Sequence, residues 1–139
     1  MERNIFLTLK SINSIDEEST TTELNSVGVL RILENDDIEI SYEESEATGF
    51  KGSTTFIIIS KDSMVTMKRT GSAPSILTIE ENQRHLCHYG TPYGDIYMGI
   101  YTHTVENNIT FDGGDLYLKY TIDANSNYVS DNEIFLHVK

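Results

Sequence analysis

The sequence is poor in cysteine and in cationic side chains, and both shortages exclude classes of protein. Cys87 is the single cysteine, so no disulfide can form within the chain and a reducing compartment fits best. Ten lysines and arginines stand against 22 aspartates and glutamates, which gives a formal net charge of -12 at pH 7. Because such a chain repels phosphate backbones and anionic bilayer surfaces, neither nucleic acid nor a membrane is an expected partner.

The sequence also lacks long apolar runs. The longest strongly apolar run, at residues 56–59, cannot cross a bilayer, and the N-terminal residues contain no stretch long enough for a signal peptide. Together with the single cysteine, this predicts a cytoplasmic protein.

Sharp catalytic motifs are missing as well. The chain contains no Gly-x-Ser-x-Gly nucleophile elbow, no Gly-Lys-Ser/Thr of a P-loop and no Gly-x-Gly-x-x-Gly dinucleotide fingerprint. Enzymes that depend on these motifs are therefore excluded, no catalytic residue is assigned and no cofactor is expected. A non-enzymatic function is favoured, and an enzyme of unrecognised type stays open as a third alternative.

Apolar and polar side chains alternate along much of the chain, which is the pattern of strands with one wet face. Ile38, Ile40 and Tyr42, for example, are separated by Glu39 and Ser41. The pattern predicts strands at about residues 3–11, 22–34, 37–45, 52–60, 63–70, 74–80, 84–91, 93–105, 108–123 (interrupted at its glycine pair) and 128–138. A capping-box pattern at residues 14–17 allows one turn of helix at most, because the threonines at residues 20–22 that follow are poor helix formers.

Short turn-forming clusters separate these strands, and such connections can reverse a strand but cannot make the long crossover of parallel pairing. The sheet should therefore be an antiparallel meander in a single domain spanning residues 1–139. An open sheet would leave two edges and one uncovered apolar face, because few or no helices are available to cover it. The expected fold class is all-β, a closed or nearly closed barrel of about 8–10 strands, with a two-sheet β-sandwich as the alternative.

Several motifs between residues 42 and 104 are shared with a known family. They are Tyr42-Glu43-Glu44, Thr48-Gly49, Gly52 with Thr54-Thr55, residues 65–71 ending in Arg69-Thr70-Gly71, and Tyr89-Gly90-Thr91-Pro92-Tyr93-Gly94 followed by Met98 and Thr102. In this order and spacing they resemble the YwiB-like family of small bacterial proteins of unknown function. The resemblance implies a calycin-like β-barrel in a bacterial cytoplasm, and it brings no established activity or catalytic residue.

The wider calycin group includes lipocalins and fatty-acid-binding proteins, which suggests a barrel that holds a small ligand by an analogy of fold. The chain has no tryptophan and so lacks the Gly-x-Trp element of a true lipocalin. The resemblance therefore does not imply a lipocalin ligand.

Arg69 is the charged residue best suited to a site inside the barrel. On its strand it shares a face with Met67, whereas Lys68 points the other way. Glu44 similarly continues the face of Tyr42, so two opposite charges would lie at the ends of two apolar strips and offset each other's desolvation. The pair suits a structural ion pair or, alternatively, an anchor for a polar or anionic ligand.

These features predict a non-enzymatic barrel that binds a small molecule or a peptide in its cavity or at its mouth. The candidate contacts are Arg69, Glu44, Tyr42, Tyr89, Thr91 and Met98. The alternative is a protein–protein interaction module, because alternation turns Met98 and Ile100 inward and leaves Tyr97 and Tyr101 on an outer face. The partner is thus an unknown small ligand or protein, and a monomer or weak homodimer is expected.

Residues 84–89, Arg-His-Leu-Cys-His-Tyr, resemble a metal site at first. Alternation places His85 and Cys87 on one face and His88 on the other, so this strand offers two ligands at most. A zinc site would need at least one further ligand from elsewhere, so no metal is expected and Cys87 is interpreted as a small core residue.

Overall fold

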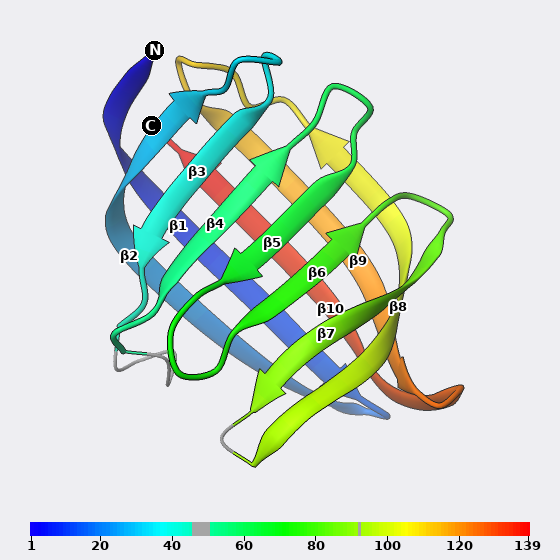
Figure 1. The fold of residues 1–139 in the computed structure, drawn as a ribbon. Helices are drawn as coiled ribbons and strands as arrows, with labels where there is room; N and C mark the ends of the chain where they lie inside the picture. The colour runs from blue at the N-terminus through cyan, green and yellow to red at the C-terminus, as the bar shows by residue number, and fades with distance from the viewer. Residues whose placement is uncertain (46–50, 92) are drawn as a thin grey trace.

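The chain folds into a closed barrel of ten antiparallel strands (Figure 1). The computed structural model describes residues 1–45, 51–91 and 93–139, and these residues contain no helix, hence none long and apolar enough to cross a membrane. The strands are β1 (Glu2–Ile15), β2 (Glu18–Ile32), β3 (Ile38–Glu43), β4 (Thr54–Ile59), β5 (Val65–Arg69), β6 (Ser75–Ile79), β7 (Arg84–Thr91), β8 (Gly94–Asn107), β9 (Gly114–Ala124) and β10 (Asn127–Val138).

Each strand pairs with its neighbours in the sequence, and β1 closes the barrel by pairing with β10. The predicted all-β meander barrel is therefore confirmed, and the alternative two-sheet sandwich is not formed. Closure gives every strand a partner on both sides along at least part of its length, which is why no helical layer is needed.

The connection between β1 and β2 is a tight hairpin, and the single turn of helix that the sequence allowed at residues 14–17 is not formed. Ile15 pairs with Glu18, which leaves Asp16 and Glu17 as the turn residues. Asp16 has a positive φ of 55°, a conformation used in tight hairpins. The hairpin is more stable than the helical turn because the ladder between two long strands forms many hydrogen bonds, whereas a single helical turn is costly to nucleate.

The end of the barrel near the two chain termini is filled by aliphatic side chains. Leu30, Ile59, Val65, Ile79 and Leu116 are all buried there, each at an interior position of its strand. Side chains of this kind pack closely and leave little empty volume, so this end of the barrel is an ordinary hydrophobic core.

The connection between β8 and β9 closes this aliphatic end. The sequence predicted a strand over residues 108–123 with an interruption at its glycine pair, and positive φ angles at Gly113 and Gly114 do interrupt the extended backbone. Residues 108–113 form a connection rather than a strand, so β9 begins at Gly114. Phe111 packs against the core instead. Its carbonyl oxygen accepts a hydrogen bond of 2.5 Å from Nε of Arg3, which ties the connection to the first strand.

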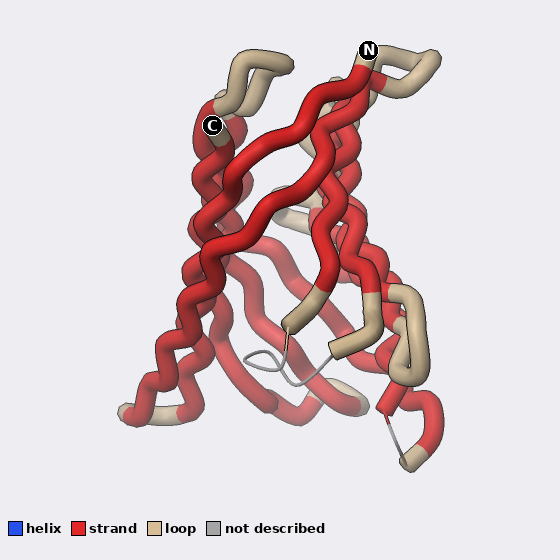
Figure 2. The backbone as a smooth tube through the Cα atoms, turned by 90° about the vertical axis from the view of Figure 1, so that its left-hand side faces the viewer, coloured by secondary structure: helices blue, strands red, loops and turns tan. Residues whose placement is uncertain are grey.

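At the opposite end the strands spread apart (Figure 2). β2 pairs with β3 only through residues 29–32, so residues 18–28 of β2 are in register with β1 alone. The two strands separate next to Gly28, where a Cβ would collide with the carbonyl oxygen of Ser41. Because Gly28 has no Cβ, β2 and β3 can come close together at this point, and beyond it they diverge.

Candidate functional site

Five interior residues form a polar row across neighbouring strands from β3 to β7. The ladder pairs Tyr42 with Thr55, Thr55 with Arg69, Arg69 with Ser75, and Ser75 with Tyr89. Their side chains share the inner face of the sheet because strand residues alternate between the two faces. The same strands that carry aliphatic residues toward the termini thus carry polar residues at the other end.

The contacts of Arg69 include one with the backbone next to this row and one with a ring of the row. Its Nε donates a hydrogen bond of 2.9 Å to the carbonyl oxygen of Ala73. The carbon of its guanidinium lies 5.3 Å from the centroid of the Tyr89 ring, within the range of a cation–π interaction. The side chain is partly buried, so these contacts position a positive charge on the inner wall of the barrel.

Glu44 brings a carboxylate to the same wall. Its Oε1 accepts a hydrogen bond of 2.5 Å from Oγ1 of Thr55, which lies between Glu44 and Arg69. Burial raises the pKa of Tyr42, the nearby Glu44 carboxylate raises it further, and Arg69 acts in the opposite direction. Tyr42 therefore stays a neutral phenol at physiological pH and can donate a hydrogen bond.

A second polar set faces this row from β1, β9 and β10. Nδ2 of Asn13 donates to Oδ1 of Asn132 at 2.7 Å, and Nδ2 of Asn132 donates to Oγ of Ser130 at 3.0 Å. Tyr120 neighbours Asn132 in the ladder. Burial raises the pKa of Tyr120, with a further contribution from Tyr89 on the facing wall. The two polar sets are therefore close enough to interact across the barrel.

Both sets line one cavity of about 240 Å³, here called the interior cavity. Its polar lining comes from strands on opposite sides of the barrel. Its apolar lining comes from Met67, Leu77 and Ile122. The cavity thus combines an apolar wall with the Arg69 guanidinium, the Glu44 carboxylate and several neutral hydrogen-bonding groups, and Lys68 also contributes to its lining. An apolar wall with a few polar groups is the usual make-up of a small-molecule site.

Four of the six predicted ligand contacts lie together in the interior cavity. They are Arg69, Glu44, Tyr42 and Tyr89. Met98 is half-buried opposite Cys87 and is not among the described residues that line the cavity. The side chain of Thr91 lies outside the described part of the chain, as do Pro92 and the Thr48-Gly49 motif.

The sequence interpretation missed nine of the 13 described residues that line the cavity. The missed polar or charged residues are Asn13, Thr55, Lys68, Ser75, Tyr120 and Asn132. The available signal was a polar residue at an interior position, such as Thr55 two residues before Ile57, or Asn132 two residues before Ile134. That signal marks single positions, whereas their convergence depends on strand register and on closure of the barrel.

Cys87 belongs to the buried core, whereas His85 and His88 on the same strand are partly exposed. Within residues 1–45, 51–91 and 93–139, no three His, Cys, Asp or Glu side chains gather closely enough to hold a metal ion. His85 instead places Nε2 2.8 Å from Oε1 of Glu80. Sγ of Cys87 accepts the backbone N–H of Thr78 at 3.3 Å, and burial raises the pKa of the thiol, which makes it a poor nucleophile.

The two tyrosines predicted to form an outer face do lie outside, on β8. The exposed fraction is 63% for Tyr97 and 37% for Tyr101. Leu86, on β7, pairs with Gly99 between them and is 67% exposed. The outer surface of β7 and β8 therefore carries an apolar patch, defined here by these three side chains.

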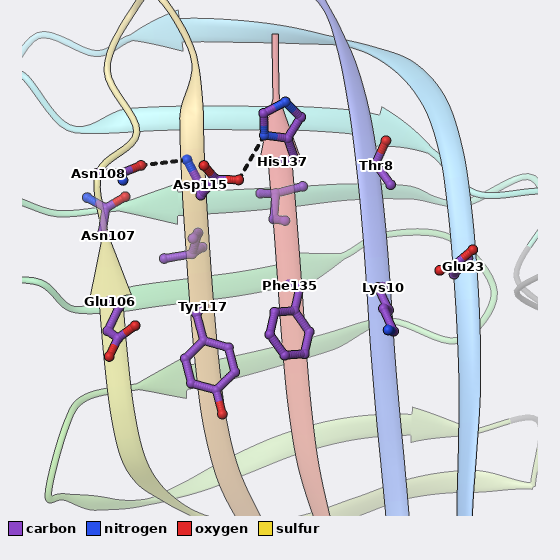
Figure 3. A pocket seen from close by; sticks show the side chains of 12 residues that line it. Thr8, Lys10, Glu23, Glu106, Asn107, Asn108, Asp115, Tyr117, Phe135 and His137 are labelled. Atoms are coloured by element: carbon purple, nitrogen blue, oxygen red, sulfur yellow. Dashed lines mark hydrogen bonds and ion pairs between the residues drawn. The ribbon is translucent and has the colours of Figure 1, made fainter.

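A shallow groove of about 500 Å³ crosses the outer face of β9, β10 and β1 (Figure 3). The rings of Tyr117 and Phe135 are cross-strand partners with centroids 4.8 Å apart. Nζ of Lys10 lies 5.9 Å from the Phe135 centroid, and the Tyr117 hydroxyl donates to Oε1 of Glu133 at 2.8 Å. Because these groups contact one another as ordinary cross-strand pairs do, the interior cavity is the stronger candidate site.

The fold and the cavity define a ten-stranded antiparallel meander barrel with one aliphatic end and one polar end. The family model described as a domain of unknown function, DUF1934, matches residues 7–136. The chain belongs to this family.

A solved structure supports the same assignment. The crystal structure of the YwiB protein from Bacillus subtilis is similar with a TM-score of 0.87 and 15% sequence identity, over 99% of this chain and 92% of that chain. At this identity the likeness shows the fold alone, and the predicted relation to the YwiB-like family is confirmed. Among curated proteins no sequence matches the chain.

Proposed function

We propose that this protein binds a small polar molecule that carries an anionic group inside the interior cavity. The observation that carries the proposal is the placement of the Arg69 guanidinium on the wall of a small cavity lined by neutral donors on both sides. A guanidinium can hold a carboxylate or a phosphate through two parallel hydrogen bonds, which gives both affinity and orientation.

The composition of the two ends supports a role beyond packing. Burying a polar group that lacks a full set of hydrogen bonds costs roughly 1–3 kcal/mol. Aliphatic side chains fill equivalent inner positions near the termini, as Ile59 does on the strand that carries Thr55. Polar residues around the interior cavity therefore lower stability relative to aliphatic residues at the same positions. This cost favours a functional reason for the polar residues.

The size and charge of the cavity narrow the class of ligand. A volume of about 240 Å³ corresponds to about eight water molecules at roughly 30 Å³ each. It is smaller than the roughly 300–1,000 Å³ typical of sites for drug-sized molecules. Glu44 can accept a hydrogen bond from the ligand, so a small carboxylate or phosphate that also carries a hydroxyl or amino group fits best.

The test is a thermal-shift and calorimetric screen of small carboxylates and phosphates against the full chain, together with native mass spectrometry of protein isolated from its own cells. We expect at least one compound to bind the wild-type protein and R69M to bind it at least about tenfold more weakly, because a charge-assisted contact contributes roughly 1.5–3 kcal/mol. K119M, which removes an exposed cation on the outer face of β9, is the matched control and should bind like wild type.

Two results would contradict the proposal. One is a bare protein in native mass spectrometry with no binder in the screen. The other is a binder whose affinity is the same for R69M and for the wild-type protein.

The apolar patch of Leu86, Tyr97 and Tyr101 favours a second candidate function, contact with a partner protein. Exposed aromatic side chains are enriched at such contacts. If this were the function, Y97S with Y101S would abolish a partner complex recovered by cross-linking in cells, while R69M would leave it intact.

A further inference from the structure

Residues 18–28 of β2 present a long backbone edge with which no described strand other than β1 pairs. Residues 18–28 are in register with β1 on one side, and the pairing with β3 begins only at Val29. Among the described strands, this is the longest stretch that pairs on one side alone. Backbone groups on such an edge are available to a further strand.

Hydrogen bonds at the end of β2 show which residues turn toward the edge. The N–H of Ile32 donates to the carbonyl oxygen of Met1, next to β1, whereas the N–H of Leu33 donates to the carbonyl oxygen of Asp37, next to β3. Backbone groups alternate in direction along an antiparallel strand, and the β1–β2 ladder has no register shift. Odd-numbered residues of β2 therefore point away from β1.

This alternation identifies the groups on the unpaired edge. They belong to Ser19, Thr21, Glu23, Asn25 and Val27. One of these groups has its partner within β2 itself, because the carbonyl oxygen of Val27 accepts a hydrogen bond of 3.0 Å from the hydroxyl of Ser26. Residues 18–28 contain no proline, no lysine and no bulge, which are the common means of blocking an edge.

The edge borders a groove of about 820 Å³ between β2 and the end of β3. Phe6 and Val27 flank it on the outer surface with exposed fractions of 64% and 65%. The charged side chains among the described residues that line it are Glu43 and Glu44, and no lysine or arginine is among them. The groove therefore offers backbone hydrogen bonds, apolar contact area and negative charge together.

We propose that an extended segment of a partner protein, with basic side chains alternating with apolar ones, adds to the edge of β2 as a strand. An unpaired edge is completed by a strand, and specificity comes from side chains that alternate between the two faces. Outward side chains of the added strand would lie near Glu23 and Glu43, which favours lysine or arginine there. A second copy of this chain is disfavoured because each copy carries a net charge of -12.

The test uses the full chain and two blocked, fluorescently labelled peptides of about ten residues, one alternating valine with lysine and the other alternating valine with glutamate. We expect the lysine peptide to bind, and the glutamate peptide to bind at least about tenfold more weakly. Bound lysine peptide should slow hydrogen exchange at the edge amides of residues 19, 21, 23, 25 and 27. Equal affinity for the two peptides, or protection confined to other strands, would overturn the proposal.

Two variants at one position separate the backbone from the side chain. N25P removes an edge N–H that points away from β1 and should weaken binding at least about tenfold, whereas N25A keeps the N–H and should bind within about twofold of wild type. Binding that is unaffected by N25P would overturn the proposal.

Charge variants keep the test decisive if N25P does not fold. E43K should weaken the lysine peptide by about fivefold, whereas E106K, which makes the same change of charge on the outer face of β8, should weaken it by less than about twofold. Equal effects of the two variants would contradict the proposal, and so would self-association of the protein through β2 in sedimentation. Arg69 takes no part, so failure here leaves the ligand proposal standing.

Discussion

The two ends of the barrel are built from the same strands and yet are stabilised in different ways. Near the termini, side chains such as Leu116 and Ile59 fill the interior by close packing. At the other end, Arg69, Thr55 and Asn132 form hydrogen bonds around a cavity. Close packing favours stability, whereas a cavity lined by hydrogen-bonding groups favours recognition of a ligand. Mutations at the aliphatic end should therefore chiefly change the free energy of unfolding, and mutations at the polar end should chiefly change ligand binding.

The largest effect is expected at the aliphatic end. Leu116→Ala should lower the free energy of unfolding by about 3 kcal/mol, because it leaves a cavity in a close-packed core. Urea denaturation measures the change, and Leu86→Ala, at an exposed position, should stay within about 0.5 kcal/mol of wild type. A loss of less than about 1 kcal/mol for Leu116→Ala would mean that this end is not the main stabilising core.

A smaller effect is expected where hydrogen bonds take the place of packing. Asn132→Ala should cost about 2 kcal/mol, because it leaves Nδ2 of Asn13 without its acceptor in a partly buried place. A double-mutant cycle with Asn13→Ala should give a coupling energy of about 1 kcal/mol. Strictly additive effects of the two substitutions would show that this hydrogen bond does not stabilise the polar end.

The sequence predicted the fold well because most strands show an alternation of apolar and polar residues within their own sequence. Alternation along residues 38–42, for example, identifies both the strand and its inner face without any knowledge of the neighbours. Short turns between such strands leave an antiparallel meander as the natural arrangement, and an uncovered apolar face favours closure. The differences fell at connections. Residues 14–17 form part of a hairpin without the single helical turn that was allowed there, and residues 108–113, before the start of β9, form a connection instead of a strand.

The candidate site was predicted only in part because it is a property of register. Arg69 and Glu44 were identified as inward charges, since a charge on an apolar strip is conspicuous. Asn13 and Asn132 are neutral and far apart in the chain, and only the pairing of β1 with β10 brings them together. Likewise the free edge of β2 is visible only once β3 is seen to be the shorter partner.

The smallest expected effect concerns alkaline pH and again separates the two ends. Burial, with the Glu44 carboxylate nearby, raises the pKa of Tyr42 in the folded barrel, whereas in the unfolded chain a tyrosine titrates near pH 10. The folded state therefore holds the Tyr42 proton more tightly than the unfolded chain does. The stability that this difference contributes is fully present below about pH 10 and is lost as pH rises above that value. Tyr42→Phe should reduce the slope of unfolding free energy against pH above pH 10 by up to about 1.4 kcal/mol per pH unit.

Leu116→Ala should lower stability at every pH and leave that slope unchanged, because no titrating group is altered. Urea denaturation at several pH values gives both slopes, and the same slope for wild type and Tyr42→Phe would show that the phenol at the polar end is not desolvated.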